Sequence, residues 1–291
     1  MARLPGNDQT SVMSWTVLGL VRASHPEPTA AVTTVAGLLA VGVGHPPGGI
    51  ATVALTVAAS QFAVGWTNDL LDADRDATVG RTDKPVATGA VGRRPVAVAA
   101  LLAAAVTVGL ALSTNPTAAL WATIGLASAL LYDWPLKSTP VSVLPYAVSF
   151  GALPAFVVLA LPGAPAPPVW LLAAAALLGA GAHFANVLPD LADDARTGVR
   201  GLPHRLGPAG SQAAAVGLLL VATGTLVLGP PGPPSGLGLA AVAAAVVIPA
   251  LAWYAGRTAD RAGARPATAF RAVMLVALID VVLLVTSGRL V

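Results

Sequence analysis

Two groups of acidic residues dominate the polar part of this sequence. Of its 13 Asp and Glu residues, eight lie at positions 69–83 and 190–194, and each group follows directly on a long apolar run. Carboxylates gathered this closely repel one another, and near a bilayer they are costly unless a cation or a basic side chain compensates them. A solvated acidic helix end would explain either group alone. Two groups with matched spacing favour a cation-binding site.

Helical spacing would place most of these side chains on two ridges. At about 100° per residue, the first group forms one oxygen-rich face if the preceding helix continues through it. Asp74 points away from that face on the same geometry. The members of the two ridges are Asn68, Asp69, Asp72 and Asp76 in the first, and Asn186, Asp190, Asp193 and Asp194 in the second.

Magnesium and a diphosphate group fit two such ridges. The sequence contains no cysteine, so any metal ion would be held by oxygen or imidazole ligands. Mg²⁺ is typically bound by one or two carboxylates together with substrate phosphates. Facing ridges would hold a diphosphate through bridging ions and neutralise the charge that develops as it leaves. Apolar helices beneath would take a hydrocarbon tail, so an allylic diphosphate satisfies both requirements.

Membrane helices are the elements that must position these ridges. The 291 residues are 56% hydrophobic and 10% charged, whereas a soluble domain is about 25% charged. The mean hydropathy is +0.77. These values predict a membrane protein. A helix needs about 20 mainly apolar residues to span a bilayer, and nine segments come close to that length, so the expected fold is an all-α, polytopic bundle. The segments are 29–44, 49–67, 95–112, 118–132, 141–161, 169–188, 211–228, 237–256 and 268–286.

The distribution of basic residues predicts the orientation. Four loops (45–48, 113–117, 162–168 and 229–236) contain no Lys or Arg, whereas the loops that alternate with them are basic and include both acidic groups. The positive-inside rule then places the acidic groups on the cytoplasmic side of the cell membrane. The basic residues form no basic domain, so no nucleic-acid partner is expected. Residues 1–27 are predicted to be an interfacial segment, and residues 28–291 a nine-helix transmembrane domain.

These motifs resemble those of the UbiA superfamily of intramembrane prenyltransferases. Its first motif, N-D-x-x-D-x-x-x-D followed by an Arg and a basic-Pro pair, is similar to residues 68–76 with Arg81 and Lys84. Its second, D-x-x-x-D, is similar to residues 190–194, and its loop after the fourth span is similar to residues 132–137. The departures are Lys84 in place of Arg, an additional acid at position 193 and a shortened loop. These departures leave the acceptor subfamily open.

The resemblance implies a UbiA-like bundle with cytoplasmic capping loops and a Mg²⁺-dependent transfer of a prenyl group. The donor would be an isoprenoid diphosphate and the acceptor an aromatic or other lipid-soluble molecule within the membrane lipid. The implied metal ligands are Asp69, Asp72, Asp76, Asp190 and Asp194, with Asn68 and Asn186 as nearby polar ligands. The implied substrate-binding residues are Tyr132 and three cations, Arg81, Lys84 and Lys137, for which the alternative is ordinary loop charge.

Polar residues deeper in the predicted spans are weaker candidates. Gln61 and His183 each lie seven residues before a ridge residue, so each falls on a ridge face about two turns deeper. Each of them either contacts the substrate or forms a hydrogen bond with a neighbouring helix. His204 lies in a basic loop that could cap the site. Asp280 is the only acid of the ninth predicted span, and a structural hydrogen bond is favoured for it.

Three other functions share some of these features. A membrane terpene cyclase of the same superfamily would use the same Asp motifs without an acceptor, but only 5% of the residues are aromatic. The CDP-alcohol phosphotransferases carry a D-G-x-x-A-R signature that neither acidic loop contains. An ion-coupled transporter would place isolated acids near the middle of the membrane. Prenyl transfer therefore remains the favoured function, with cyclisation as the alternative.

Overall fold

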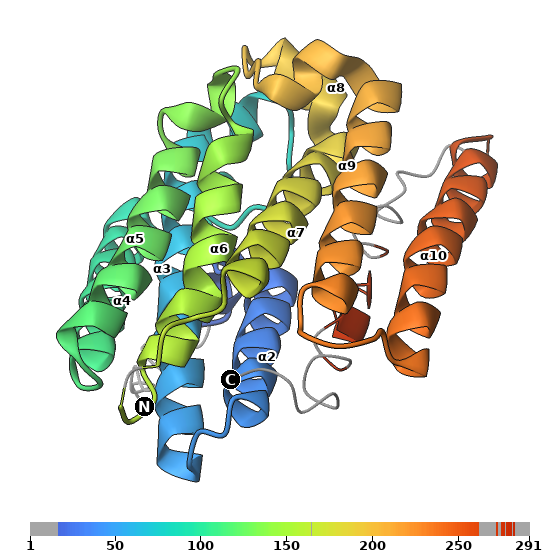
Figure 1. Cartoon of the computed structure of the whole chain (residues 1–291). Helices are drawn as coiled ribbons and strands as arrows, with labels where there is room; N and C mark the ends of the chain where they lie inside the picture. The colour runs from blue at the N-terminus through green and yellow to red at the C-terminus, as the bar shows by residue number, and fades with distance from the viewer. Residues whose placement is uncertain are drawn as a thin grey trace, which may run out of the picture.

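The computed structural model is a bundle of long helices, most of which run roughly along one direction (Figure 1). It describes residues 17–163, 165–261, 272, 275, 276, 278–280 and 282. Residues 17–23 are helical, and no strand occurs in the described chain. The elements are α2 (Pro26–Gly42), α3 (Pro47–Thr78), α4 (Arg93–Leu112), α5 (Pro116–Asp133), η1 (Leu136–Ser138), α6 (Val143–Leu159), α7 (Val169–Val187), η2 (Leu188–Asp190), α8 (Leu191–Arg196), α9 (Leu202–Leu228) and α10 (Gly236–Arg261).

The first eight predicted spans each coincide with one of these helices. Within the described chain, four helices are long and apolar enough to cross a membrane, namely Pro47–Thr78, Arg93–Leu112, Val169–Arg196 and Leu202–Leu228. Two shorter helices, Val143–Leu159 and Gly236–Ala252, are also apolar. Most of the ninth predicted span, 268–286, lies outside the described residues. Asp280 is described within it, and it accepts a hydrogen bond of 3.0 Å from Thr223 on α9, which confirms a structural hydrogen bond.

The helices pack side by side in chain order and close around a common interior. α3 packs on α2 and α4, α6 on α5 and α7, and α9 on α7 and α10. Contacts of α2 with α6 and of α3 with α5 close the arrangement. The largest buried cluster joins the helix ends farthest from the acidic motifs, with Leu39, Val53 and Phe156 among its members. This cluster seals one end of the bundle with apolar side chains.

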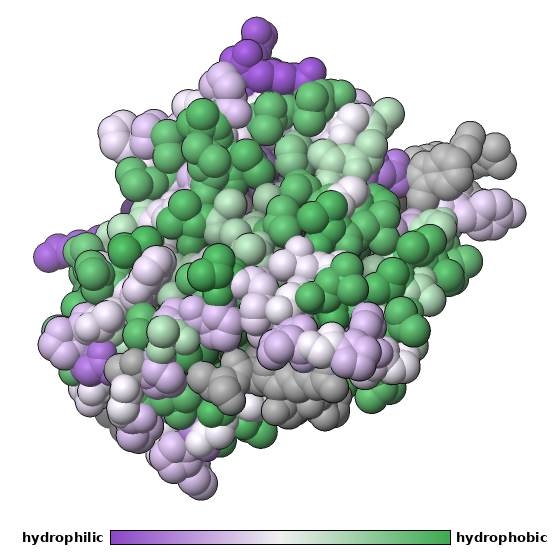
Figure 2. Space-filling view, in the orientation of Figure 1, coloured by the Kyte–Doolittle hydropathy of each residue, from purple (hydrophilic) through white to green (hydrophobic). Residues whose placement is uncertain are grey.

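The surface separates an apolar belt from a polar end. Figure 2 shows hydrophobic residues across the upper and middle part of the visible side, with the densest group of strongly hydrophilic residues at the end where Figure 1 places α8. Large apolar side chains such as Leu101, Leu102 and Leu120 point outward from α4 and α5. In water an exposed apolar surface of this extent would be unfavourable, so this belt fits a hydrocarbon environment.

The two acidic motifs differ in backbone structure. α3 continues without interruption to Thr78, which confirms the prediction that helix persists through residues 68–76. At the second motif α7 ends at Val187, and Pro189 stands in the 3₁₀ turn η2 that leads into α8. Proline removes a backbone donor and clashes with the preceding turn, so a regular helix does not pass through it. The second ridge is therefore a helical segment interrupted by a 3₁₀ turn, not one regular helical face.

The loop predicted to contain His204 is also helical. α9 begins at Leu202, earlier than the predicted start at residue 211, and bends at Gly207, whose φ is 69°. Pro208 follows that glycine and accounts for the bend, because its ring cannot continue the helix regularly. His204 thus lies on a short helical arm that folds over the polar end of the bundle.

Candidate active site

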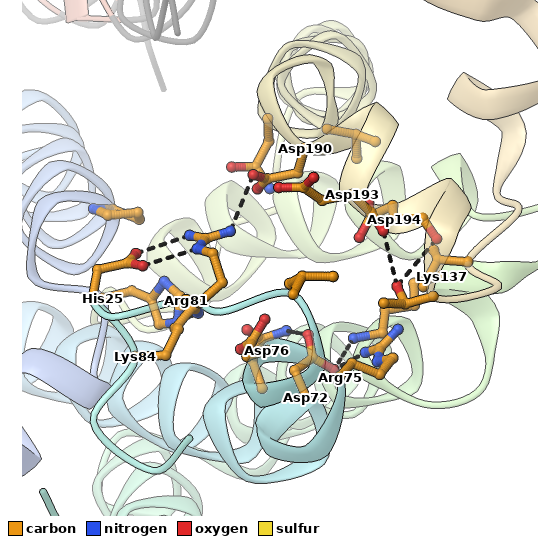
Figure 3. Close-up of a pocket in the computed structure, with 18 of the residues that line it drawn as sticks. His25, Asp72, Arg75, Asp76, Arg81, Lys84, Lys137, Asp190, Asp193 and Asp194 are labelled. Atoms are coloured by element: carbon orange, nitrogen blue, oxygen red, sulfur yellow. Dashed lines mark hydrogen bonds and ion pairs between the residues drawn. The ribbon is translucent and has the colours of Figure 1, made fainter. Parts of the chain in front are cut away.

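A cavity of about 470 Å³ opens at the polar end of the bundle. Carboxylates from the end of α3 lie on one side of it and those of η2 and α8 lie on the other, with Arg81 reaching between them (Figure 3). It brings together 11 of the 13 predicted site residues. They are Asn68, Asp72, Asp76, Arg81, Lys84, Tyr132, Lys137, His183, Asn186, Asp190 and Asp194.

Asp72 is the electrostatic centre of the α3 side. It forms ion pairs with Arg75, one turn further along α3, and with Lys137 of η1. Asn68 donates hydrogen bonds to Asp72 at 3.3 Å and to Asp133 at 3.2 Å. Burial and the charge of Arg75 lower the pKa of Lys137 to about 8. α3 and the short loop after α5 are thereby fixed to each other through their charged side chains.

Asp76, one turn beyond Asp72, faces the same cavity with a free acceptor atom. Its Oδ2 is buried and has no hydrogen-bond partner. A buried acceptor without a partner is costly, since it has lost water and gained nothing in return. This atom is therefore suited to a ligand that supplies a positive charge.

Asp69 does not line the cavity, although the first motif predicts it as a ligand. It is 1% exposed, and its carboxylate accepts a hydrogen bond of 3.2 Å from the Val86 backbone N–H. Lys84 Nζ lies 3.6 Å from its Oδ1. These contacts hold the loop after α3 against the helix. Asp69 thus supports the cavity wall from behind, and its role as a metal ligand stays a prediction.

Arg81 connects the two acidic motifs across the cavity. Its Nη1 lies 3.2 Å from Asp190 Oδ1, and its Nε donates to Asp83 at 2.9 Å. The hydrogen bond with Asp83 raises the pKa of Arg81, and Asp190 adds to that effect. The same hydrogen bond lowers the pKa of Asp83 to about 2. Arg81 is a permanent cation positioned between the motifs, where it can contact an anionic ligand.

His25 is a site residue that the sequence motifs did not indicate. It lies just before α2 in a left-handed conformation, with φ at 53°, and its Nε2 is 3.0 Å from Lys84 Nζ. Burial lowers its pKa to about 4, and the charges of Lys84 and Arg81 add to the shift. A neutral imidazole accepts the lysine hydrogen. The strained backbone is a signal visible only in three dimensions.

His25 is held at the cavity because the segment before α2 packs closely against α3. Gly65 of α3 packs on the backbone of Ser24, whose carbonyl oxygen would lie only 2.6 Å from an added Cβ. Trp66 donates to the Leu20 carbonyl at 2.8 Å and fixes the same segment. A side chain at position 65 would displace the segment that carries His25.

A second, more apolar cavity of about 200 Å³ lies beneath the first. The boundary between the two is formed by residues that line both, namely His25, Pro28, Asn68, Tyr132 and Asn186. Gln61 lines only the deeper of these two cavities, and so do Asp133 and Tyr146, which the sequence analysis did not select. The predicted site therefore has a charged upper part and an apolar lower part.

Aromatic rings surround the boundary between the cavities. Tyr132 meets Tyr146 edge to face at 4.8 Å and His183 at 5.4 Å, while Phe150 stacks on Tyr146 at 6.2 Å. His183 also forms a hydrogen bond of 3.0 Å with Ser142, the residue just before α6. Both suggested roles of His183 are thus compatible with its position, since it contacts another helix and lines the cavity.

The residues present fit Mg²⁺ when substrate oxygens complete its coordination. Within the described chain, no three His, Asp or Glu groups converge closely enough to hold a metal ion by themselves. The α3 and α8 carboxylates instead face each other across the cavity, and Asp76 offers a buried acceptor without a partner. Mg²⁺ commonly takes one or two carboxylates and fills its remaining positions with phosphate oxygens and water. Such an ion suits this arrangement.

Comparisons with known proteins agree with this architecture. The model of the UbiA prenyltransferase family matches residues 30–279. The chain is 35% identical over 162 residues to digeranylgeranylglyceryl phosphate synthase of Methanopyrus kandleri, covering 53% of this chain and 56% of that protein. The match thus spans about half the length of that curated relative.

Solved structures share the fold over nearly the whole chain. A UbiA homolog from Aeropyrum pernix K1 has a TM-score of 0.70 at 22% identity, covering 90% of this chain and 96% of that one. A UbiA homolog from Archaeoglobus fulgidus bound to GPP and Mg²⁺ has a TM-score of 0.69 at 17% identity, with coverage of 93% and 98%. The family match, which covers most of the sequence, confirms the resemblance stated above. This chain belongs to the UbiA prenyltransferase family.

Proposed function

We propose that this protein transfers a prenyl group from an isoprenoid diphosphate to a lipid-soluble acceptor. The observation that supports it is the pairing of a charged cavity with an apolar one across a shared boundary. The diphosphate would occupy the upper cavity and its hydrocarbon tail the lower one. C1 of the prenyl group, where the bond breaks, would then lie near Asn68, Tyr132 and Asn186.

The charged cavity would assist departure of the leaving group. Asp72, Asp76, Asp190 and Asp194, with Asn68 and Asn186 nearby, would hold Mg²⁺, which when bound supplies positive charge that stabilises the diphosphate. Arg81, Lys84 and Lys137 would donate hydrogen bonds to diphosphate oxygens, and these interactions strengthen as negative charge develops. His25 would orient Lys84 by accepting one of its hydrogens.

The reaction needs no reactant besides the prenyl diphosphate and the acceptor. The C1–O bond breaks with its electron pair leaving on the diphosphate, which generates an allylic cation in the lower cavity. The faces of Tyr132 and Tyr146 would stabilise that cation, since aromatic rings attract positive charge. A nucleophilic atom of the acceptor then bonds to C1, and its proton passes to the departed diphosphate.

The acceptor class is the open part of this proposal. The motifs suggested an aromatic acceptor, whereas the curated relative is named for a glyceryl phosphate lipid. A glyceryl phosphate acceptor is therefore the second candidate, and it is anionic like the diphosphate. Cyclisation without an acceptor is the alternative that the aromatic residues around the boundary favour.

One assay separates these possibilities. Membranes that contain the protein are incubated with labelled prenyl diphosphates and Mg²⁺, together with an aromatic acid, with geranylgeranylglyceryl phosphate, or without an acceptor. Prenyl transfer predicts a labelled lipid whose mass is the sum of prenyl group and acceptor. A labelled cyclic hydrocarbon or alcohol without acceptor would establish cyclisation instead. Recovery of intact diphosphate in every arm would contradict both.

We further propose that the active site faces the cytoplasm, as the positive-inside rule predicts. The natural absence of cysteine makes the test direct. A cysteine introduced at exposed Ser235, in the loop before α10, is expected to react with an impermeant thiol reagent added to intact cells. A cysteine at Ala77, near the end of α3, is expected to react only after the membrane is opened. The reverse pattern would overturn this orientation.

A further inference from the structure

A third, smaller cavity of about 70 Å³ lies next to the lower one. The two share a ring of five lining residues, Val32, Gln61, Ala129, Ser149 and Phe150, which we call the neck. Beyond the neck the lining comes from α3, α4, α5 and α6. Figure 1 shows α5 beside α6, and α3 packs on both α4 and α5. A chain that enters at the diphosphate site would therefore continue through the neck toward the opposite end of the bundle.

The far end of this path is closed. Trp121 and Phe156 line the third cavity. Phe156 belongs to the buried cluster that seals that end of the bundle, and Trp121 packs against it. Phe156 is 1% exposed. The tail thus meets two large rings with a close-packed core behind them.

The depth of the path follows from helix geometry. From Asn68 at the boundary to Thr56 in the third cavity, α3 rises by about 18 Å at 1.5 Å per residue. α5 gives about 16 Å from Tyr132 to Trp121 by the same measure. An extended isoprene unit spans about 5 Å, because it contributes four carbon–carbon bonds of about 1.5 Å in a zigzag. The path therefore accommodates three fully extended units, and about half of a fourth.

We infer that Trp121 and Phe156 form the end stop that sets the maximum prenyl chain length, in the range from a farnesyl group of three units to a geranylgeranyl group of four. This inference rests on the proposed function, since it assigns the lower cavities to the prenyl tail. The neck is the second determinant, because Ala129 is a small residue there and leaves the path open. A larger side chain at that position would stop the tail before the third cavity.

The test measures kcat/KM for dimethylallyl, geranyl, farnesyl, geranylgeranyl and solanesyl diphosphates with one acceptor. The wild type is expected to prefer geranylgeranyl over solanesyl diphosphate by at least about tenfold, the scale on which a filled apolar pocket rejects excess carbon. Trp121→Ala is expected to raise relative use of the solanesyl donor at least about tenfold. Ala129→Leu is expected to depress use of farnesyl and geranylgeranyl donors while sparing the dimethylallyl donor.

Two controls keep the outcome interpretable. Ala127→Leu makes the same change on the exposed side of α5 and should leave the length preference unaltered. Binding of unreactive prenyl thiodiphosphates with the same chain lengths measures the chain-length preference independently of turnover. If wild type and variants share one length profile, or if solanesyl diphosphate equals geranylgeranyl diphosphate in the wild type, the end stop is refuted. Absence of binding and turnover at every length would instead refute the proposed function.

Discussion

Asp190→Asn and Asp72→Asn are each expected to lower prenyl transfer at least about 100-fold, the scale of losing one charge-stabilising group. Both changes preserve side-chain shape but remove a negative charge from one of the two facing motifs. Asp190 contacts Arg81 at 3.2 Å, and Asp72 pairs with Lys137 and Arg75. Each motif alone supplies too few oxygens to hold a metal-bridged diphosphate. Initial rates at equal membrane expression, measured across Mg²⁺ concentrations, provide the test.

The two variants also control for each other. Asp72 is largely enclosed, and its loss leaves the buried Lys137 ammonium without its closest partner, which can destabilise the fold. The Asp190 side chain is 41% exposed, so its amide variant is expected to fold normally. Full activity of Asp190→Asn, or undiminished turnover of the wild type in EDTA, would show that metal-assisted departure is not the mechanism.

Asp76→Ala is expected to be nearly inactive, whereas Asp74→Ala should retain activity within about tenfold of the wild type. The two residues lie in one unbroken helix and differ in the direction in which they point. Asp76 lines the cavity with an unpartnered oxygen. Asp74 is 85% exposed and pairs with Arg93 outside the cavity, where an ion pair contributes little.

Comparing Asp74→Ala with Asp76→Ala tests whether activity depends on the direction in which a carboxylate points or only on the total negative charge near the membrane surface. If negative charge near the membrane surface were all that mattered, loss of either acid would have a similar consequence. Turnover and Mg²⁺ half-saturation are to be compared for both variants at matched expression. Equal failure of Asp74→Ala and Asp76→Ala would contradict the orientation of the α3 ridge.

Local sequence periodicity was sufficient to predict which carboxylates of α3 share one face of the helix. The apolar run before Asn68 passes directly into the motif, and no proline interrupts it before residue 85. Helical geometry then determined which carboxylates share a face. At the second motif a 3₁₀ turn at Pro189 interrupts the regular helix, yet all four predicted ridge residues still line one cavity. There the carboxylates reach one cavity through a turn whose shape depends on packing against α9.

Contacts between distant segments required the tertiary structure. His25 and Lys84 are far apart in the chain, and so are Arg81 and Asp190, yet each pair lies within 3.2 Å. No local pattern encodes such pairs, since they arise when the segment before α2 docks on Gly65 and when η2 and the loop after α3 line the same cavity. Asp69 shows that one residue can meet both kinds of constraint: its motif position predicts a metal ligand, and packing places its Oδ2 against the Val86 N–H.

The sequence by itself determined the membrane bundle, the family and the chemical character of the site. Hydropathy and charge depend on residue type and order, and the helix period fixes which side chains share a face. Only the tertiary structure decided which cations oppose which carboxylates, how far the apolar path extends and where it is closed. Those properties depend on the distances between helices, and helix packing sets these distances through side chains that are remote in sequence.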